Sequence, residues 1–271
     1  GKAFLESHQI SGKECCIGIS CGGPLDSGRG VILSPPNLPG WDQVPIVSYL
    51  EQRLDMDARL KNDADACALA EWRYGAGRGC RHMIFLTFGT GLGAGLVLNG
   101  RLYEGACGMA GEAGHVRLAE EGPVGYEKAG SFEGFCSGGG IARLARSMAE
   151  DALKAGRPVS YMKEGGLDDI TARDVAEAAE MGCADAGEVL AVSGRYFGRG
   201  LAMLVDILNP ERIVAGGIYA RAGRFLKDEM EKELRREALP ASVNACCILP
   251  CGLGEQIGDY GAVMAALEMW E

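Results

Sequence analysis

The sequence predicts an α/β protein, because short apolar runs that end in glycines alternate with longer segments of helical periodicity. Two such runs, CCIGISCGG at 15–23 and ERIVAGG at 211–217, are typical of buried strands that open onto a loop. Between them, HMIFLTFGTGLGAGLVLNGRLYEG predicts a strand, a glycine-rich turn, a second strand and an Asn99-Gly100 hairpin turn. This alternation places the chain in the α/β class.

The other elements follow from periodicity and turn residues. GKAFLESHQISG is interpreted as the last turns of a helix that ends at Gly12, and Pro-rich SPPNLPGW at 34–41 as a loop. Thr171 is expected to cap the helix that follows it. Helices are expected at 44–54, 64–74, 138–155, 171–181, 185–207 and 259–270, and further strands at 58–63 and 244–250.

Composition sets the class of protein. With 271 residues, 47% apolar and 24% charged, the chain can bury a sizeable core as one large domain or two smaller lobes. A net charge of −10 argues against a nucleic-acid surface, since affinity for phosphate backbones comes from clustered Lys and Arg. The sequence has no run of eighteen apolar residues and no recognisable signal peptide, so a cytoplasmic location without membrane contact is expected.

The eleven cysteines are an odd number, which does not suit a framework of disulfides. Four of them lie inside apolar, strand-like runs: Cys15, Cys16, Cys246 and Cys247. They are therefore expected to be core thiols in a reducing compartment.

Two glycine-rich turns could approach a ligand. In TFGTGLGAG, the backbone N–H groups of Gly89, Thr90 and Gly91 could cradle an anion, although a plain tight hairpin is the commoner explanation. The segment matches neither the P-loop nor the dinucleotide fingerprint. In IVAGG, Gly216 and Gly217 indicate either a simple strand-to-helix turn or close approach to a flat or charged ligand.

Asn62 and Asp63 stand where a strand passes into a helix. Both residue types cap helices well, so a capping pair is one interpretation. The other is a general base at Asp63 beside an Asn62 that binds a substrate hydroxyl, and such a base must reach the proton it removes.

The segment AGEAGHVRLAEEGPVGYEKAGSFEGFC at 110–136 holds five glutamates and one histidine. It lacks HExxH or Cys/His metal spacing, which disfavours a metal site. The side chains of Glu112, His115 and Glu133 would instead suit vicinal hydroxyls, which need both acceptors and donors. The remaining glutamates, Glu120, Glu121 and Glu127, are interpreted as a solvated face.

Several motifs in this order resemble the ROK family (repressor, open reading frame, kinase) from about Cys15 to Ala266. They are GISCGGPLD, PNLPGW, NDADACALAEW, TFGTGLGAGLVLNGRLYEG, AGEAGH, SFEGFCSGG and LNPERIVAGG. The resemblance implies a two-lobed, actin-like ATPase (ribonuclease H-like) fold. It implies a small lobe at 1–62, joined by a closing helix at 258–271, and a large lobe at 63–257.

The resemblance also implies ATP-dependent phosphorylation of a hexose or N-acetylhexosamine at a primary hydroxyl, with glucose as the default. Asp63 would be the catalytic base. The sugar would be held by Asn62, Glu112, His115 and Glu133, with lesser contacts from Asn37 and Gly23. The nucleotide, with Mg²⁺, would be held by Gly89, Thr90, Gly91, Gly216 and Gly217. A homodimer is implied as well. The alternatives are a sugar-sensing regulator and an inactive sugar-binding relative.

Two departures from the family pattern stand out. Many members bind a structural zinc through three cysteines, but this chain has Val124, Tyr126 and Ser131 there. His115 alone cannot form a tetrahedral site, so no zinc is expected, and packing of Tyr126, Phe132 and Phe135 is expected to replace it. The family's D-x-G-G-T hairpin is also missing from this sequence and is expected upstream of Gly1 in the gene product.

Overall fold

The computed structural model describes residues 7–8, 15–162 and 165–267. The helix predicted from the first twelve residues lies almost wholly outside the described residues. The helices are α2 (Ile46–Leu54), α3 (Asp63–Tyr74), α4 (Phe132–Phe135), α5 (Gly138–Lys154), α6 (Ala172–Glu180), α7 (Ala184–Leu208), α8 (Gly217–Glu237), α9 (Pro240–Ala245) and α10 (Ile257–Leu267). The strands are β1 (Cys16–Cys21), β2 (Leu25–Asp26), β3 (Val31–Ile32), β4 (Asp57–Asn62), β5 (Met83–Phe88), β6 (Leu92–Leu98), β7 (Arg101–Leu102), β8 (Val124–Gly125), β9 (Lys128–Ala129), β10 (Arg212–Ala215) and β11 (Cys247–Pro250).

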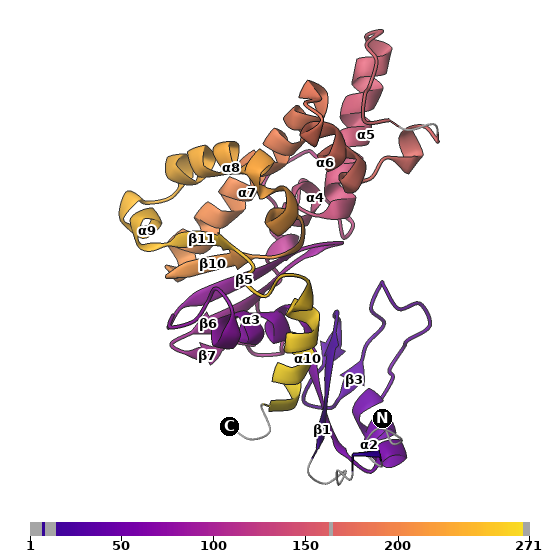
Figure 1. The fold of residues 1–271 in the computed structure, drawn as a ribbon, viewed down its shortest axis with the longest axis vertical. Helices are drawn as coiled ribbons and strands as arrows, with labels where there is room; N and C mark the ends of the chain where they lie inside the picture. The colour runs from indigo at the N-terminus through magenta and orange to yellow at the C-terminus, as the bar shows by residue number, and fades with distance from the viewer. Residues whose placement is uncertain (1–6, 9–14, 163–164, 268–271) are drawn as a thin grey trace.

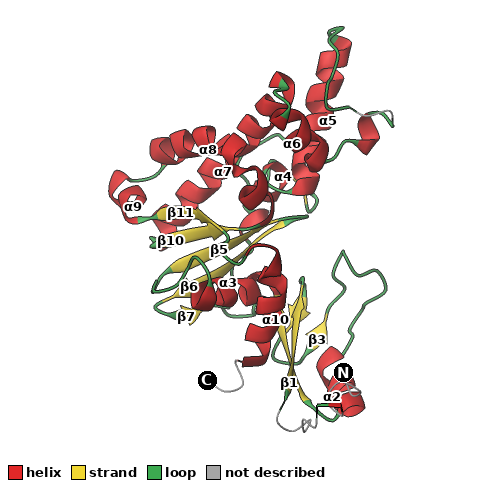
Figure 2. Ribbon diagram, viewed as in Figure 1, coloured by secondary structure: helices red, strands yellow, loops and turns green. Residues whose placement is uncertain are grey.

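A five-stranded sheet forms the centre of the molecule, in the order β11-β10-β5-β6-β7. Strands β11, β10 and β5 are parallel, while β6 and β7 continue the sheet as antiparallel hairpins. Figure 1 shows α4 to α8 above this sheet, α3 and α10 beneath it, and β1 and α2 beyond α10. Figure 2 shows the sheet enclosed by helices on both faces. The predicted α/β class is confirmed.

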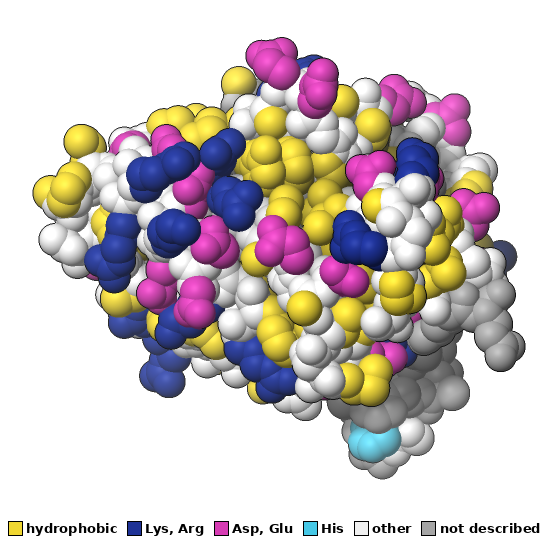
Figure 3. All heavy atoms as spheres, turned by 90° about the horizontal axis from the view of Figure 1, so that it is seen from above, with side chains coloured by type: hydrophobic (Ala, Val, Ile, Leu, Met, Phe, Trp, Pro, Cys, Tyr) yellow, Lys and Arg dark blue, Asp and Glu magenta, His cyan; other side chains and the backbone are white. Residues whose placement is uncertain are grey.

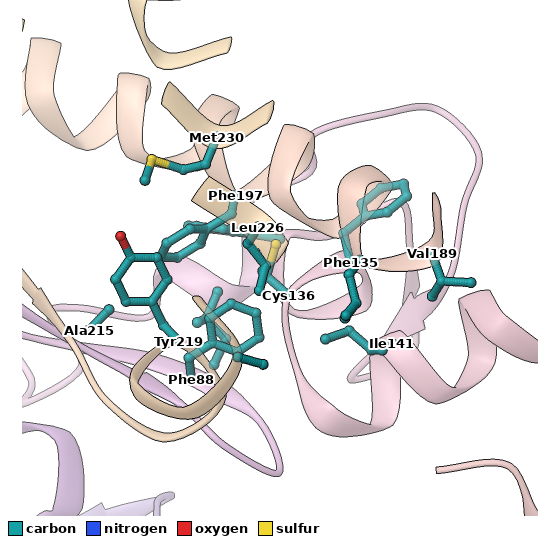
Figure 4. Packing of buried hydrophobic residues seen from close by; sticks show 14 of the residues in the cluster. Phe88, Phe135, Cys136, Ile141, Val189, Phe197, Ala215, Tyr219, Leu226 and Met230 are labelled. Carbon is teal, nitrogen blue, oxygen red and sulfur yellow. The ribbon is translucent and has the colours of Figure 1, made fainter. Parts of the chain in front are cut away.

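The largest core lies between the sheet and the upper helices. Phe197 of α7 is fully buried and packs against three other rings, with centroids 5.2 Å from Phe88, 5.3 Å from Tyr219 and 6.0 Å from Phe132. Figure 4 shows Phe88, Phe197 and Tyr219 facing one another from β5, α7 and α8. Tilted aromatic pairs of this kind stabilise a core beyond the area that they bury.

Helices α7 and α8 pack closely because α7 carries small residues at its contact face. A Cβ at Gly194 would lie 2.4 Å from the Leu226 carbonyl, and one at Gly198 would lie 2.5 Å from that of Met230. Beside this seam, Arg199 donates to the buried Glu233 at 2.6 Å. Figure 3 shows basic and acidic side chains interspersed over this upper side of the molecule.

The smaller sheet pairs β1 with β4 in parallel, Cys21 standing opposite Asn62. Strand β1 rests on α10 through Gly18, where a Cβ would lie 1.8 Å from the Ala262 carbonyl. All six residues of β1 are only half-buried, so the prediction of a buried strand is wrong in that respect. The physical reason is that β1 has a single partner strand, β4, among the described residues.

The order of the other predicted elements is confirmed, with three corrections. The predicted strand at 244–250 is shorter, since Asn244 and Ala245 end α9 and β11 begins at Cys247. Helices α4, α8 and α9 are absent from the predicted elements, although the buried residues of α8 recur every three or four positions. The four cysteines predicted to be core thiols are not: Cys247 is exposed on the edge strand β11, and Cys15, Cys16 and Cys246 are half-buried. Across the described ranges, no helix is long and apolar enough to span a bilayer.

Candidate functional site

Asn62 ends β4 and caps α3. Its Oδ1 atom accepts hydrogen bonds from the N–H groups of Ala64 at 2.9 Å and Asp65 at 3.4 Å, so the capping interpretation is confirmed. The cap occupies only the oxygen of the amide. The Nδ2 atom lies 3.5 Å from where a Cβ would stand on Gly23, so it faces the loop after β1. Asn62 therefore keeps a donor group for another contact.

Asp63 is the first residue of α3, and its Oδ1 accepts from the Ala64 N–H at 2.8 Å. Its Oδ2 lies 3.7 Å from where a Cβ would stand on Gly22, so the glycines after β1 leave room beside the carboxylate. Asp63 is an exposed residue, and its carboxylate is open to solvent on one side. Burial on the other sides raises the pKa of the carboxyl, although the Ala64 hydrogen bond opposes this. A raised pKa makes the ionised carboxylate a better proton acceptor.

Glu112 and His115 are brought to one side by a single turn of 3-10 helix at Ala113–His115, in which the His115 N–H donates to the Glu112 carbonyl at 3.1 Å. Gly111 makes this turn possible, since its φ is +88° and a Cβ there would lie 1.9 Å from the Ala94 carbonyl. The segment between Glu112 and His115 therefore turns, which is the condition for the two side chains to act together.

The surroundings of Glu112 show which other groups lie near it. Burial raises the pKa of its carboxyl, and the negative charges of Glu133 and Asp63 raise it further, while His115 opposes the shift. The structure therefore brings Asp63, Glu112, His115 and Glu133 into one electrostatic neighbourhood, although they come from two helices and a loop.

Glu133 lies in the first turn of α4, which Ser131 caps by accepting from the Gly134 N–H at 3.1 Å. Its Oε2 accepts from the Leu92 N–H at 3.0 Å. A Cβ at Gly91 would stand 2.7 Å from the same oxygen, so any other residue there would displace the Glu133 carboxylate. Glu133 thus touches the glycine-rich turn as well as the cluster around Glu112.

The two glycine-rich turns lie side by side, because β10 pairs with β5 in parallel. Gly217 has a φ of +55°, and a Cβ there would stand 2.0 Å from the Phe88 carbonyl. The Gly216 N–H donates to Leu86 at 3.0 Å, and Gly216 is buried. The first residue of α5, Gly138, donates to the Gly89 carbonyl at 2.8 Å, a contact that the motifs alone did not indicate.

The prediction that Gly89, Thr90 and Gly91 all keep free N–H groups is wrong for Gly89, which donates to the Gly91 carbonyl at 3.1 Å. This bond continues the antiparallel β5–β6 pairing by one step beyond Phe88 and Leu92. In the described part of the chain, no acceptor faces the N–H groups of Thr90 and Gly91, and Thr90 is exposed.

Asn37 is not joined to the other predicted site residues. It lies exposed in the loop between β3 and α2, which Figure 1 shows extending away from the small sheet. Among the described contacts, none links Asn37 to Asn62, Asp63, Glu112 or Glu133.

The segment that has Val124, Tyr126 and Ser131 in place of the zinc cysteines is not held by the contacts that were predicted. Tyr126 is 56% exposed and contacts the His115 ring edge-on at 4.7 Å, so it does not pack with Phe132 and Phe135, which are buried. Hydrogen bonds hold the β8–β9 hairpin instead: Arg117 to the Ala129 carbonyl at 3.0 Å, Lys128 to the His115 carbonyl at 2.6 Å and Ser131 to the Gly125 carbonyl at 3.3 Å. Within the described ranges, no group of three His, Cys, Asp or Glu side chains could hold a metal ion.

Comparison with known proteins places this site in context. The model of the ROK family matches residues 2–269. The chain is 35% identical over 261 residues to a glucokinase of Halalkalibacterium halodurans, covering 95% of this chain and 78% of that one. It is 29% identical to the N-acetylglucosamine repressor of Escherichia coli, covering 88% of this chain and 57% of that one.

Solved structures agree with the family model. The crystal structure of a ROK family glucokinase from Streptomyces griseus in complex with glucose and AMPPNP superposes with a TM-score of 0.80 at 31% identity, covering 97% of this chain and 84% of that one. The two-lobed, actin-like ATPase fold that the sequence predicts is thereby confirmed. The chain therefore belongs to the ROK family.

Proposed function

We propose that this protein transfers a phosphoryl group from ATP to a primary hydroxyl of a hexose or N-acetylhexosamine, with glucose as the default substrate. The observation that carries the proposal is the shared neighbourhood of Asp63, Glu112, His115 and Glu133. Carboxylates and an imidazole in one place match the alternating donors and acceptors of a sugar. The similarity to glucokinases supports the same substrate class.

In this proposal Asp63 is the catalytic base. Its Oδ1 is held by the Ala64 N–H, and its Oδ2 faces the space left by Gly22. The fixed carboxylate accepts the proton of the attacking hydroxyl. Phosphoryl transfer depends mostly on positioning and charge neutralisation. The protein therefore needs to supply only a base that is held in place and has a raised pKa.

The neighbouring groups hold the other hydroxyls. Asn62 offers Nδ2, since its oxygen caps α3. Glu133 offers its second oxygen, Oε1, since Oε2 accepts from Leu92. Glu112 and His115 add an acceptor and a group that can donate or accept. We propose lesser contacts for Gly23, which adjoins Asn62, and for Asn37 from its loop.

The nucleotide is proposed to bind at the paired glycine turns. A Cβ at Gly89 would meet nothing within 4 Å, so this turn presents open backbone, and Thr90 and Gly91 retain their N–H groups. Helix α8 begins at Gly217, beside this turn, and the start of a helix favours phosphate. Mg²⁺ is proposed to accompany ATP, where it would neutralise phosphate charge.

We propose the lobe division of 1–62 with 258–271 against 63–257, which puts Asn62 and Asp63 at the boundary. ATP and sugar would then meet between the lobes as these close. We also propose a homodimer, as the family resemblance implies, in the cytoplasm. Structural zinc is left out of the proposal because Val124, Tyr126 and Ser131 stand where many members have cysteines.

A sugar-sensing regulator is the second candidate, since the N-acetylglucosamine repressor of Escherichia coli is 29% identical over 246 residues. That repressor is longer than this chain, which covers 57% of it. A regulator would use the hydroxyl-binding residues without needing Asp63 as a base.

The deciding experiment measures ADP release by the full-length protein with Mg-ATP and each of glucose, mannose, fructose, N-acetylglucosamine and N-acetylmannosamine. Release that depends on a sugar is expected and would identify the substrate. Calorimetric binding of a sugar without any release would favour the regulator or an inactive relative.

A further inference from the structure

An ion pair links the β1–β4 sheet to the end of the five-stranded sheet, close to the proposed sugar site. The Nζ of Lys61, on β4, lies 3.1 Å from Oε1 of Glu104, which follows β7. Strand β4 belongs to the small sheet and β7 to the large one. The pair therefore links elements that the chain separates by 43 residues.

Each partner adjoins a part of the proposed site. Lys61 directly precedes Asn62 and Asp63. Glu104 stands at the start of the loop that leads to Glu112, and its carbonyl also accepts from the Ala110 N–H at 3.1 Å. Glu104 thus holds this loop through its backbone and its side chain.

Backbone hydrogen bonds hold the two ends of the loop, from the Tyr103 N–H to the Leu96 carbonyl at 2.8 Å and from the Ala94 N–H to the Gly111 carbonyl at 2.8 Å. The five residues 105–109 are all exposed, so no apolar packing fixes them. In contrast, the Lys61 side chain is only 8% exposed and that of Glu104 is 40% exposed. A buried ammonium group needs a nearby anion, because desolvation of an uncompensated charge is costly.

Both members of the pair also line a neighbouring hollow. The hollow has a volume of about 510 Å³ and runs from the β2–β3 turn to Glu104. Three cationic side chains line it, those of Arg29, Arg59 and Lys61, and Glu104 is the single carboxylate among its lining residues. Glu104 therefore faces a positive surface, which favours its position against β4.

We propose that the Lys61–Glu104 ion pair positions the 103–112 loop, and with it Glu112, against Asn62 and Asp63. This inference rests on the proposed function, since it gives Lys61 and Glu104 a role in sugar affinity. They are positioning residues that act through Glu112 and Asn62 and do not touch the sugar. The pair sets the distance between the base and one of its proposed hydroxyl-binding partners.

The test compares Lys61→Met, Glu104→Gln and the reversed pair, Lys61→Glu with Glu104→Lys, in the full-length protein. Each single variant is expected to raise the KM for sugar about tenfold, equivalent to about 1.4 kcal/mol, with a smaller change in kcat. Amide hydrogen exchange in residues 103–112 is expected to become faster, and the reversed pair is expected to restore both properties in part. The matched control, Arg224→Met, removes an exposed ion pair to Glu180 of 2.8 Å and should change neither.

Unchanged exchange in residues 103–112 for Glu104→Gln would overturn the proposal, as would exchange that becomes equally fast in α5, since the effect would then be global. The proposal would also be overturned if the reversed pair restored neither the KM for sugar nor the exchange rate of the loop. If the wild-type protein releases no ADP with any sugar, the kinase proposal fails. The exchange rates of residues 103–112 would still decide whether the ion pair holds the loop.

Discussion

The Glu133 carboxylate accepts a hydrogen bond from the Leu92 amide at 3.0 Å, and this contact joins the proposed hydroxyl-binding cluster to the glycine-rich turn. Leu92 begins β6, directly after that turn, whereas Glu133 lies in the first turn of α4. One oxygen of Glu133 is fixed by the sheet, so the direction of the other is fixed too. A displacement of the glycine turn would consequently move a group proposed to bind the sugar.

Replacement of Glu133 by Gln is expected to weaken sugar binding by roughly 2–4 kcal/mol, since charge-assisted bonds to hydroxyls are lost. The Gln side chain can still accept from Leu92, so the fold should persist. Titration calorimetry with the sugar that supports ADP release measures the effect. Glu127→Gln, at an exposed position of the β8–β9 hairpin, is the control and should bind as the wild type does. An affinity unchanged by Glu133→Gln would remove Glu133 from the site.

Asp63→Asn is expected to lower kcat by about 10²–10⁴-fold, which is the usual contribution of a positioned general base. Sugar affinity should stay within a few-fold, because Asn retains the acceptor that binds the Ala64 N–H. Steady-state ADP release gives the first quantity and calorimetry the second. Turnover close to that of the wild type would mean that Asp63 only helps to start α3.

Glu71 is expected to be the carboxylate on which stability depends most. It is fully buried at the end of α3 and accepts hydrogen bonds from the N–H groups of Ala76 at 2.7 Å, Leu253 at 2.9 Å and Gly252 at 3.1 Å. The Cys251 thiol donates to it as well, at 3.0 Å. These bonds fasten the segment that leads into α10.

Glu71→Ala would leave those donors without their acceptor, and the free energy of unfolding should fall by about 2–4 kcal/mol. Urea unfolding followed by circular dichroism measures this change. Glu188→Ala, at an exposed position of α7, serves as the control and should lie within about 0.5 kcal/mol of the wild type. Equal urea midpoints for the two variants would show that the hydrogen bonds of Glu71 make no net contribution to the free energy of unfolding.

Local patterns predicted most elements because each has a local cause. The Asn99-Gly100 turn follows from two residues that adopt φ of +55° and +73°, and the start of α6 follows from the Thr171 cap with its reciprocal Asp174 bond. The 3-10 turn that aligns Glu112 with His115 has a local cause as well, because glycines stand in it and beside it.

What the sequence could not show depends on partners distant along the chain. The half-burial of β1 depends on which strands pair with it, and the Lys61–Glu104 ion pair depends on how two sheets meet. The amide of Gly89 is satisfied inside its own turn, a detail of conformation that a glycine motif does not specify. Asn37 lies exposed in a long loop, and a motif does not specify how such a loop is directed towards residues of other elements.

The raised pKa of Asp63 has a consequence for stability that is separate from catalysis. Burial raises the pKa of this carboxyl in the folded protein above its ordinary value of 3.8. The folded state therefore binds this proton more tightly than the unfolded chain does. The stabilisation from the bound proton is complete below pH 3.8 and is lost as the pH rises through the folded pKa.

Asp63→Asn removes this titration, so the variant should have a higher Tm than the wild type at pH 7, and the difference should shrink as the pH falls towards 3.8. The pKa of Glu112 is raised as well, chiefly by burial, but Glu112 titrates in both proteins and largely cancels in the comparison. Thermal unfolding of both proteins across pH 4–8 measures the difference. A Tm gap that is constant with pH, or that favours the wild type at pH 7, would show that ionised Asp63 is not destabilising. A gap that opens with rising pH would mean that the fold gives up stability to keep a basic carboxylate at the start of α3.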